Sequence, residues 1–135
     1  MLMPCLGKDN GTMTAPEHPA VTVTFAGSGD AFGSGGRYQA CIYLQAPGSL
    51  GPVLVDCGTT SLSALKRLGL DPGEIAAVFV SHLHGDHSGG LPFLILDGQF
   101  SRRTKPLTIA GPPGTARRRS PASPSTTSAW ITMPP

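Results

Sequence analysis

The chain has 135 residues, of which 39% are hydrophobic and 13% charged, and its net charge is +2. That length allows one ordinary domain with a core, and so mild a charge does not by itself indicate a nucleic-acid-binding protein. No stretch approaches the roughly 18 apolar residues of a membrane span, the amino terminus lacks a hydrophobic targeting segment, and three cysteines without metal-finger spacing predict reduced thiols. We therefore expect a cytoplasmic protein without membrane contact.

The chain begins with an expected leader, a strand and a glycine-rich loop. Residues 1–20 are polar, aperiodic and rich in Pro and Gly, which predicts a disordered leader. Val21 to Phe25 alternate apolar and hydroxylic side chains, the pattern of a half-buried strand. The glycines from Gly27 onward are spaced GxGxxxG and precede another strand. This spacing argues against a dinucleotide-binding loop and favours a strand-to-strand connection.

Two more strands and a helix are expected next. Residues 38–45 and 53–57 have the composition of strands, and a turn-rich segment separates them. Leucines then recur three residues apart over residues 62–68, which predicts a helix with one buried face. Thr60 or Ser61 can cap that helix at its amino end.

A dense histidine cluster follows the next predicted strand. Residues 75–80 are a short apolar run, typical of a strand buried on both faces, and the stretch SHLHGDHSGG comes directly after it. His82 and His84 are two positions apart, so an extended backbone points them the same way. Gly85 allows a bend that turns Asp86 and His87 toward a second ion. Imidazole and carboxylate are ligands that suit zinc, and the cluster therefore predicts a metal site.

The cluster leads into a predicted helix and a further strand. Ser88 can cap a helix over about residues 88–97, and Gly89-Gly90 lets backbone pass close to the site. Residues 106–110 have the pattern of a strand. We therefore place the end of the folded region near residue 115.

Basic residues follow this helix, and a tail of different composition ends the chain. Arg102, Arg103 and Lys105 form a patch that either meets a phosphate-bearing substrate or is a solvated loop. Residues 116–135 are rich in Arg, Ser and Pro without apolar period, which predicts a disordered tail. Two explanations of the tail stay open: a genuine basic tail that binds an acidic partner, and, the one we favour, a reading-frame slip near Thr115.

The stretch SHLHGDHSGG matches the HxHxDH motif of the metallo-β-lactamase superfamily. Residues 21–115 resemble the amino-terminal half of its phosphodiesterase branch, the ribonuclease Z and cyclic-nucleotide phosphodiesterase relatives. The resemblance implies an α+β fold, the metallo-β-lactamase αββα sandwich, of which this chain carries the first half only.

The resemblance also implies roles for individual residues. On the family pattern His82 and His84 bind the first metal, and Asp86 and His87 bind the second. Asp86 has in addition the catalytic role of holding and orienting the attacking hydroxide that bridges the metals. Asp56, at the end of a predicted strand, is the carboxylate that orients the ligand loop.

Cofactor, substrate and partner are likewise expectations from the resemblance. The cofactor is Zn²⁺ at two sites in intact relatives, with Mn²⁺ or Fe²⁺ as substitutes, and the substrate is a phosphodiester such as RNA or a cyclic nucleotide. The first glycine loop, with Ser28, Gly29 and Asp30, borders the active site and can touch substrate. Intact relatives are expected to be homodimers.

The remaining ligands of the family pattern have no counterpart in this sequence. No histidine follows His87, and the last acidic residue is Asp97. We therefore expect a metal-dependent hydrolase that is truncated and inactive as an isolated chain, which leaves open whether the chain is an enzyme. The alternatives are a non-enzymatic metal-binding or interaction protein and a carboxylic ester or thioester hydrolase of the same fold.

Overall fold

The computed structural model describes residues 20–115 and 129–133. Residues 1–19 of the predicted leader and residues 116–128 and 134–135 of the predicted tail lie outside the described residues. These include His18, Cys5 and the run of arginines at 117–119.

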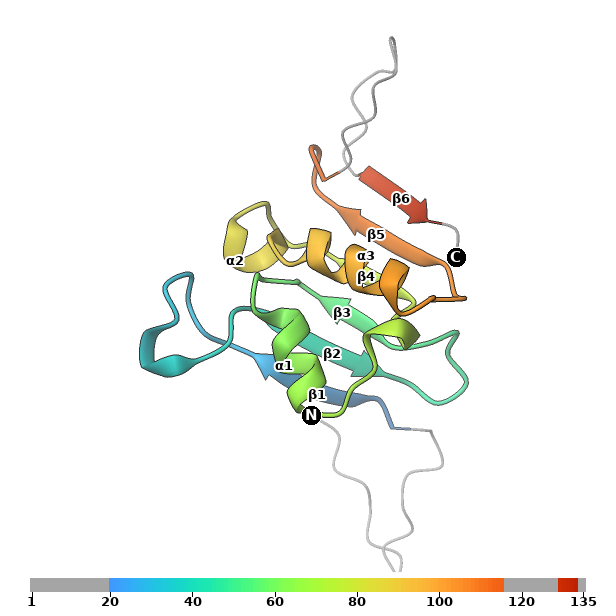
Figure 1. Cartoon of the computed structure of the whole chain (residues 1–135), viewed down its shortest axis with the longest axis horizontal. Helices are drawn as coiled ribbons and strands as arrows, with labels where there is room; N and C mark the ends of the chain where they lie inside the picture. The colour runs from blue at the N-terminus through green and yellow to red at the C-terminus, as the bar shows by residue number, and fades with distance from the viewer. Residues whose placement is uncertain (1–19, 116–128, 134–135) are drawn as a thin grey trace, which may run out of the picture.

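A single mixed sheet of six strands organises the described chain (Figure 1). The strands lie side by side in chain order: β1 (Thr22–Gly27), β2 (Cys41–Gln45), β3 (Val53–Val55), β4 (Ala77–Phe79), β5 (Leu107–Gly111) and β6 (Ala129–Met133). Neighbours are antiparallel from β1 to β3, parallel from β3 to β5, and antiparallel between β5 and β6. The parallel pairs bring the carboxyl ends of β3, β4 and β5 to one edge of the sheet.

The helices cover one face of this sheet. Figure 1 shows α1 (Ser61–Arg67) and α3 (Leu91–Phe100) on the same side of the strands, with the single turn α2 (Gly85–Ser88) at one end. Two short 3₁₀ segments, η1 (Ser34–Gly36) and η2 (Pro72–Glu74), lie in the connections. This arrangement is one sheet with its helical layer, half of an αββα sandwich.

The core lies between the sheet and these helices. One cross-strand row runs from Tyr43 through Leu54 and Val78 to Ile109, and each of these side chains is at most 5% exposed. Leu65 of α1 and Leu94 of α3 belong to the same buried cluster, and Leu62 packs against it. The third leucine of the predicted helix face, Leu68, is 51% exposed and follows the last residue of α1, so that face is shorter than predicted. Burying each large aliphatic side chain contributes about 1.5–3 kcal/mol.

The helix after the histidine cluster differs from the prediction. Instead of one helix over 88–97, the chain forms α2, a break, and then α3. Ser88 caps neither helix, because it is the last residue of α2 and its hydroxyl donates to the His84 carbonyl. Gly90 precedes α3, and Pro92 lies in its first turn, where a missing amide hydrogen costs nothing.

The tail also contains an element that its composition does not predict. Residues 129–133 pair antiparallel with all five residues of β5 as strand β6.

No helix in the part of the chain that the structure describes is long and apolar enough to cross a membrane. Of the cysteines, Cys41 and Cys57 are described, and both are buried free thiols.

Candidate metal centre

The histidine cluster begins where β4 ends, at the edge of the sheet that also holds the carboxyl end of β3. Asp56 follows β3 directly, and its amide donates to the carbonyl of Phe79, the last residue of β4, at 2.8 Å. The parallel register therefore sets the predicted orienting carboxylate beside the predicted ligand loop.

The Asp56 side chain accepts three hydrogen bonds in this region. It is 7% exposed, and it accepts hydrogen bonds from the Ser81 amide (2.7 Å), the Ser81 hydroxyl (2.8 Å) and Nδ1 of His87 (2.7 Å). Burial acts to raise the pKa of Asp56, but the hydrogen bonds from His87 and Ser81 outweigh it and lower the pKa. The residue is therefore an ionised carboxylate at neutral pH.

This carboxylate determines which ring nitrogens remain free. An ionised carboxylate only accepts, so Nδ1 of His87 carries the hydrogen and Nε2 keeps a lone pair. The Ser81 hydroxyl gives its hydrogen to Asp56, so its oxygen accepts from Nδ1 of His82 at 3.0 Å. His82 is thereby also left with a free lone pair on Nε2. Two predicted ligands are thus held in the tautomer that suits a metal.

The three imidazoles of the cluster lie together. The ring centroids of His82 and His84 are 4.8 Å apart in an edge-on arrangement, and those of His82 and His87 are 3.9 Å apart. Nε2 of His87 is 3.4 Å from a carboxylate oxygen of Asp86. His84 is exposed and the other three are half-buried, so an ion can reach them from solvent.

The donor set suits a divalent cation, but its atoms do not converge in this structure. Imidazole nitrogen and carboxylate oxygen are common zinc ligands. Within residues 20–115 and 129–133, however, no three His, Cys, Asp or Glu side chains stand close enough to hold one ion. The structure brings His82, His84, Asp86 and His87 together, and their metal-binding role stays a prediction.

Close backbone packing holds the ligand loop against the end of β3. Gly90 donates its amide to the Cys57 carbonyl at 2.8 Å, and a Cβ on Gly90 would lie 2.1 Å from the carbonyl oxygen of Gly58. A Cβ on Gly58 would in turn lie 2.3 Å from the carbonyl oxygen of Asp86. The close approach of backbone expected at Gly90 is therefore present. Gly85 was expected to permit a bend, but it begins the helical turn α2 and has open space around it.

The first glycine loop is braced from within. Oδ1 of Asp30 accepts the amides of Phe32 (3.0 Å) and Ser34 (3.1 Å). Hydrogen bonds from Ser34, followed by that of the Phe32 amide, lower the pKa of Asp30. Ser28 is exposed, while the Gly29 amide donates to the Tyr38 carbonyl at 2.6 Å. Three amides of this loop, those of Gly29, Phe32 and Ser34, are therefore already hydrogen-bonded within the chain.

Gln39 links this loop to the candidate centre and is absent from the sequence-based set. Its side-chain oxygen accepts the amide (2.7 Å) and the hydroxyl (2.6 Å) of Thr59, and its Nε2 donates to the Ala31 carbonyl at 3.0 Å. Its side chain also lies against Gly58, since a Cβ there would be 2.6 Å from that of Gln39. The only indication in the sequence was a polar glutamine side chain within the strand predicted over residues 38–45.

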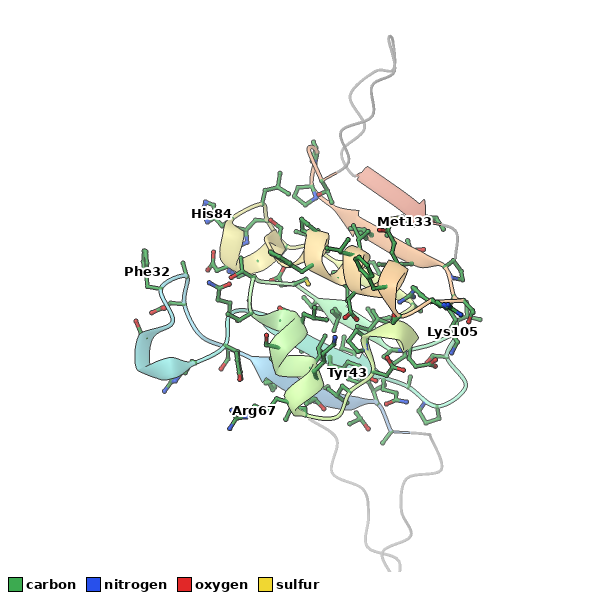
Figure 2. All side chains as sticks on the ribbon, viewed as in Figure 1. Phe32, Tyr43, Arg67, His84, Lys105 and Met133 are labelled. Carbon is green, nitrogen blue, oxygen red and sulfur yellow. The ribbon has the colours of Figure 1, made fainter. Side chains whose placement is uncertain are left out.

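The basic patch is not part of the centre. Figure 2 shows Lys105 and His84 at opposite ends of the molecule, as expected because the patch precedes β5 and the histidines follow the parallel strand β4. Arg103 donates to the carbonyls of Pro72, Ile75, Lys105 and Pro106, and Lys105 pairs with Glu74. These two cations therefore support the fold, and they lie away from the histidine cluster.

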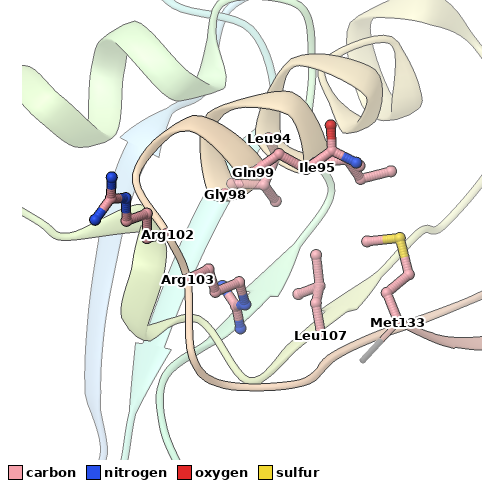
Figure 3. A pocket seen from close by; sticks show the side chains of 8 residues that line it. All are labelled: Leu94, Ile95, Gly98, Gln99, Arg102, Arg103, Leu107 and Met133. Carbon is pink, nitrogen blue, oxygen red and sulfur yellow. The ribbon is translucent and has the colours of Figure 1, made fainter. Parts of the chain in front are cut away.

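Two surface cavities flank α3. One, of about 450 Å³, lies between α3 and the β5–β6 pair and is lined largely by apolar side chains such as Leu94, Leu107 and Met133 (Figure 3). The other, of about 410 Å³, includes Leu83 and Ser88 of the ligand loop in its lining. Of these two cavities, only the second includes residues of the histidine cluster's loop in its lining.

Comparison with known proteins agrees with this geometry. The chain is 39% identical over 92 residues to ribonuclease Z of Methanothermobacter thermautotrophicus, an alignment that covers 68% of this chain and 29% of that protein. It is 44% identical over 71 residues to ribonuclease BN of Escherichia coli, covering 53% and 23%. The chain thus spans 29% and 23% of the length of these two curated relatives, less than the expected half.

Solved structures of the metallo-β-lactamase fold also match this chain over part of their length. Human tRNase Z, short form, superposes with a TM-score of 0.61 at 36% identity over 68% of this chain and 35% of that one. The metallo-β-lactamase fold protein YhfI of Bacillus subtilis superposes with a TM-score of 0.60 at 28% identity over 70% and 37%. The family profile described as anti-Pycsar protein Apyc1 matches residues 21–114. The chain therefore belongs to the Apyc1 family and carries part of the metallo-β-lactamase fold that it shares with ribonuclease Z.

Proposed function

We propose that this chain supplies the first metal-ligand loop of a phosphodiester hydrolase, and that His82, His84, Asp86 and His87 hold divalent zinc. The observation that supports this most strongly is the gathering of three imidazoles at the end of β4 beside a buried carboxylate. Zinc is the natural choice for such a donor set, with Mn²⁺ and Fe²⁺ as substitutes.

Each residue has a distinct task in this proposal. Asp56 fixes the tautomers of His82 and His87, directly or through Ser81, so that both present Nε2 to the ion. Asp86, 3.4 Å from His87, accepts a hydrogen bond from the attacking water and orients it. Bound there, a divalent cation supplies Lewis-acid chemistry, lowering the pKa of water and stabilising charge on a phosphate ester.

The proposed substrate class rests on the relatives rather than on the basic patch. Ribonucleases Z and BN are named for RNA, whose linkages are phosphodiesters. The cavity beside Leu83 has room for a nucleotide-sized group. A carboxylic ester or thioester hydrolase would use the same ligands, and only an activity comparison distinguishes it.

The isolated chain is proposed to bind metal weakly and to turn over little or no substrate. No histidine follows His87, so this chain by itself offers no later histidine ligand. Catalytic zinc usually has three protein ligands, and no three donors converge within the described residues. This also supports the second candidate, a metal-binding protein without catalysis.

A zinc titration of the purified full chain by calorimetry tests the metal site. His82→Ala is expected to weaken zinc binding at least ~10-fold. His18→Ala is the matched control, because it removes the chain's one histidine outside the cluster. Equal losses in the two variants, or no loss in His82→Ala, would contradict the proposed ligand set.

An activity comparison tests the reaction class. With zinc or manganese present, the chain is given bis(p-nitrophenyl) phosphate and p-nitrophenyl acetate. We expect at most a trace of phosphodiester hydrolysis, abolished by His82→Ala. Full turnover by the isolated chain would contradict the proposed inactivity, and His82-dependent cleavage of the acetate alone would favour the carboxylic ester alternative.

A further inference from the structure

The first glycine loop, residues 28–37 between β1 and β2, carries one aromatic side chain into solvent. Phe32 is 93% exposed, more than any other of the chain's five phenylalanines. Figure 2 shows Phe32 and His84 at the same end of the molecule. A single exposed apolar side chain is ordinary on a protein surface, so its function depends on how it is held and what lies beside it.

The loop holds Phe32 in a defined turn. The Gly33 amide donates to the Asp30 carbonyl at 3.3 Å, which makes Ala31 and Phe32 the two central residues of the turn. The Asp30 carboxylate accepts the amides of Phe32 and Ser34 from inside the loop. Gly33 has a φ of 71°, which suits glycine. The ring is therefore presented by an ordered backbone, and it has few rotatable bonds to fix on contact.

A short chain of contacts ties this turn to the ligand loop. Nε2 of Gln39 donates to the Ala31 carbonyl, and the side-chain oxygen of Gln39 accepts from Thr59. Thr59 in turn touches the end of α2, because a Cβ on Gly89 would lie 2.8 Å from Cγ2 of Thr59. Two side chains thus span the distance between the turn that carries Phe32 and the loop that carries the histidines.

The ring is the contact that the loop tip has left to offer. The amides of Gly29, Phe32 and Ser34 and the Asp30 carboxylate are already bonded within the chain. A phosphodiester bound at the histidine cluster carries its nucleobases to the side of the phosphate, and a flat aromatic face stacks on any base.

We propose that Phe32 stacks on a nucleobase of the phosphodiester bound at the histidine cluster. It is then a specificity-determining residue that favours nucleotides over phosphodiesters without a base. The inference rests on the proposed function for the site of the phosphate, and the experiment below separates the two. An apolar protein partner would need only an apolar side chain at this position, so it would accept leucine as well as phenylalanine.

The test is a titration of the isotope-labelled full chain with the dinucleotide ApA, from ~0.1 to ~10 mM with zinc present, followed by amide chemical shifts. We expect the amides of the first glycine loop to shift. Phe32→Leu is expected to raise the dissociation constant at least ~5-fold, because leucine keeps an apolar surface but lacks the flat π-face. Phe32→Tyr keeps that face and should stay within about twofold of wild type.

A matched variant and a matched ligand serve as controls. Phe100→Leu makes the same exchange at a residue that is 82% exposed and ends α3, about 15 Å along that helix from its start near the ligand loop. It should leave the dissociation constant unchanged. The abasic dimer, which is ApA without its two adenines, should bind equally to wild type and Phe32→Leu.

His82→Ala distinguishes failure of this inference from failure of the proposed function. ApA binding that is lost in His82→Ala but unchanged in Phe32→Leu would support the metal site and overturn the base contact. Binding weakened by Phe32→Leu but unchanged in His82→Ala would support the base contact and contradict the metal site. The inference is also overturned if wild type shows no shift at ~10 mM ApA, if Phe100→Leu weakens binding as much as Phe32→Leu, or if Phe32→Leu weakens binding of the abasic dimer equally.

Discussion

Replacing Asp56 by Asn probes the hydrogen-bond network that organises the histidine cluster. Asp56 has a φ of 62°, a left-handed backbone conformation that Asn adopts about as readily as Asp. The substitution therefore removes the charge and one acceptor without straining the backbone. The amide oxygen can still accept from the Ser81 amide, but an NH₂ group then takes the place of Oδ2, to which both His87 and the Ser81 hydroxyl donate.

The consequence reaches the metal-facing side of the ring. An NH₂ group donates, so Nδ1 of His87 must accept and the ring hydrogen moves to Nε2, which loses its free lone pair. Replacing the two charge-assisted hydrogen bonds to Oδ2 by neutral ones costs about 2 kcal/mol of unfolding free energy. Losing the orienting carboxylate of a ligand typically costs ~10- to 100-fold in metal affinity.

Two measurements on the same variant separate these effects. Urea denaturation gives the unfolding free energy without metal, and calorimetric titration gives the zinc affinity of the folded chain. Asp71→Asn is the control, because the Asp71 carboxylate also accepts from a backbone amide, that of Gly73 at 2.8 Å, but Asp71 is exposed and caps η2, away from the histidines. If folded Asp56→Asn binds zinc within about twofold of wild type, the tautomer argument is refuted.

Three further predictions follow from packing and burial. Gly90→Ala places a Cβ 2.1 Å from a backbone oxygen and should lower the unfolding free energy by about 1–3 kcal/mol in urea denaturation, whereas Gly85→Ala, with open space around it, should change it little. Arg103→Met leaves four carbonyls without their donor and should cost about 2–4 kcal/mol while zinc affinity stays unchanged, since Arg103 lies at the opposite edge of the sheet. Burial raises the pKa of Cys57 to about 12 and also raises that of Cys41, so both thiols stay protonated at pH 8. Iodoacetamide should therefore modify these two cysteines only after denaturation, as measured by peptide mass spectrometry. Labelling of either cysteine in the native chain would show that the core opens.

Much of the fold follows from patterns that neighbouring residues carry. The alternation over Val21 to Phe25, the apolar run before His82 and the leucine spacing of α1 each depend on residues within a few positions, and the structure has a strand, a strand and a helix there. The sequence predicted the first and last residues of the elements less accurately. The strand expected over 75–80 spans only Ala77–Phe79, because a ladder ends where the neighbouring strand stops pairing.

The candidate centre was predictable as a set of residues, but not as an arrangement. Order and spacing alone identify the three histidines and Asp86, because close imidazoles and a carboxylate suit a cation whatever the fold. The supporting residues were harder to find. Gln39 is buried and joins two loops across 20 residues of sequence, and its role depends on a contact that no local pattern reports.

The sequence by itself determined the kinds of element, the ligand candidates and the family to which they point. Only the tertiary structure decided that Asp56 meets His87 across 31 positions, that Arg103 binds backbone carbonyls, and that residues 129–133 extend the sheet. The physical reason is that periodicity reports how a segment divides its side chains between two faces, a local property. The partner of a buried polar group, or the neighbour of a strand, is set by strand order and register, which segments far apart in the chain establish only when they pack together.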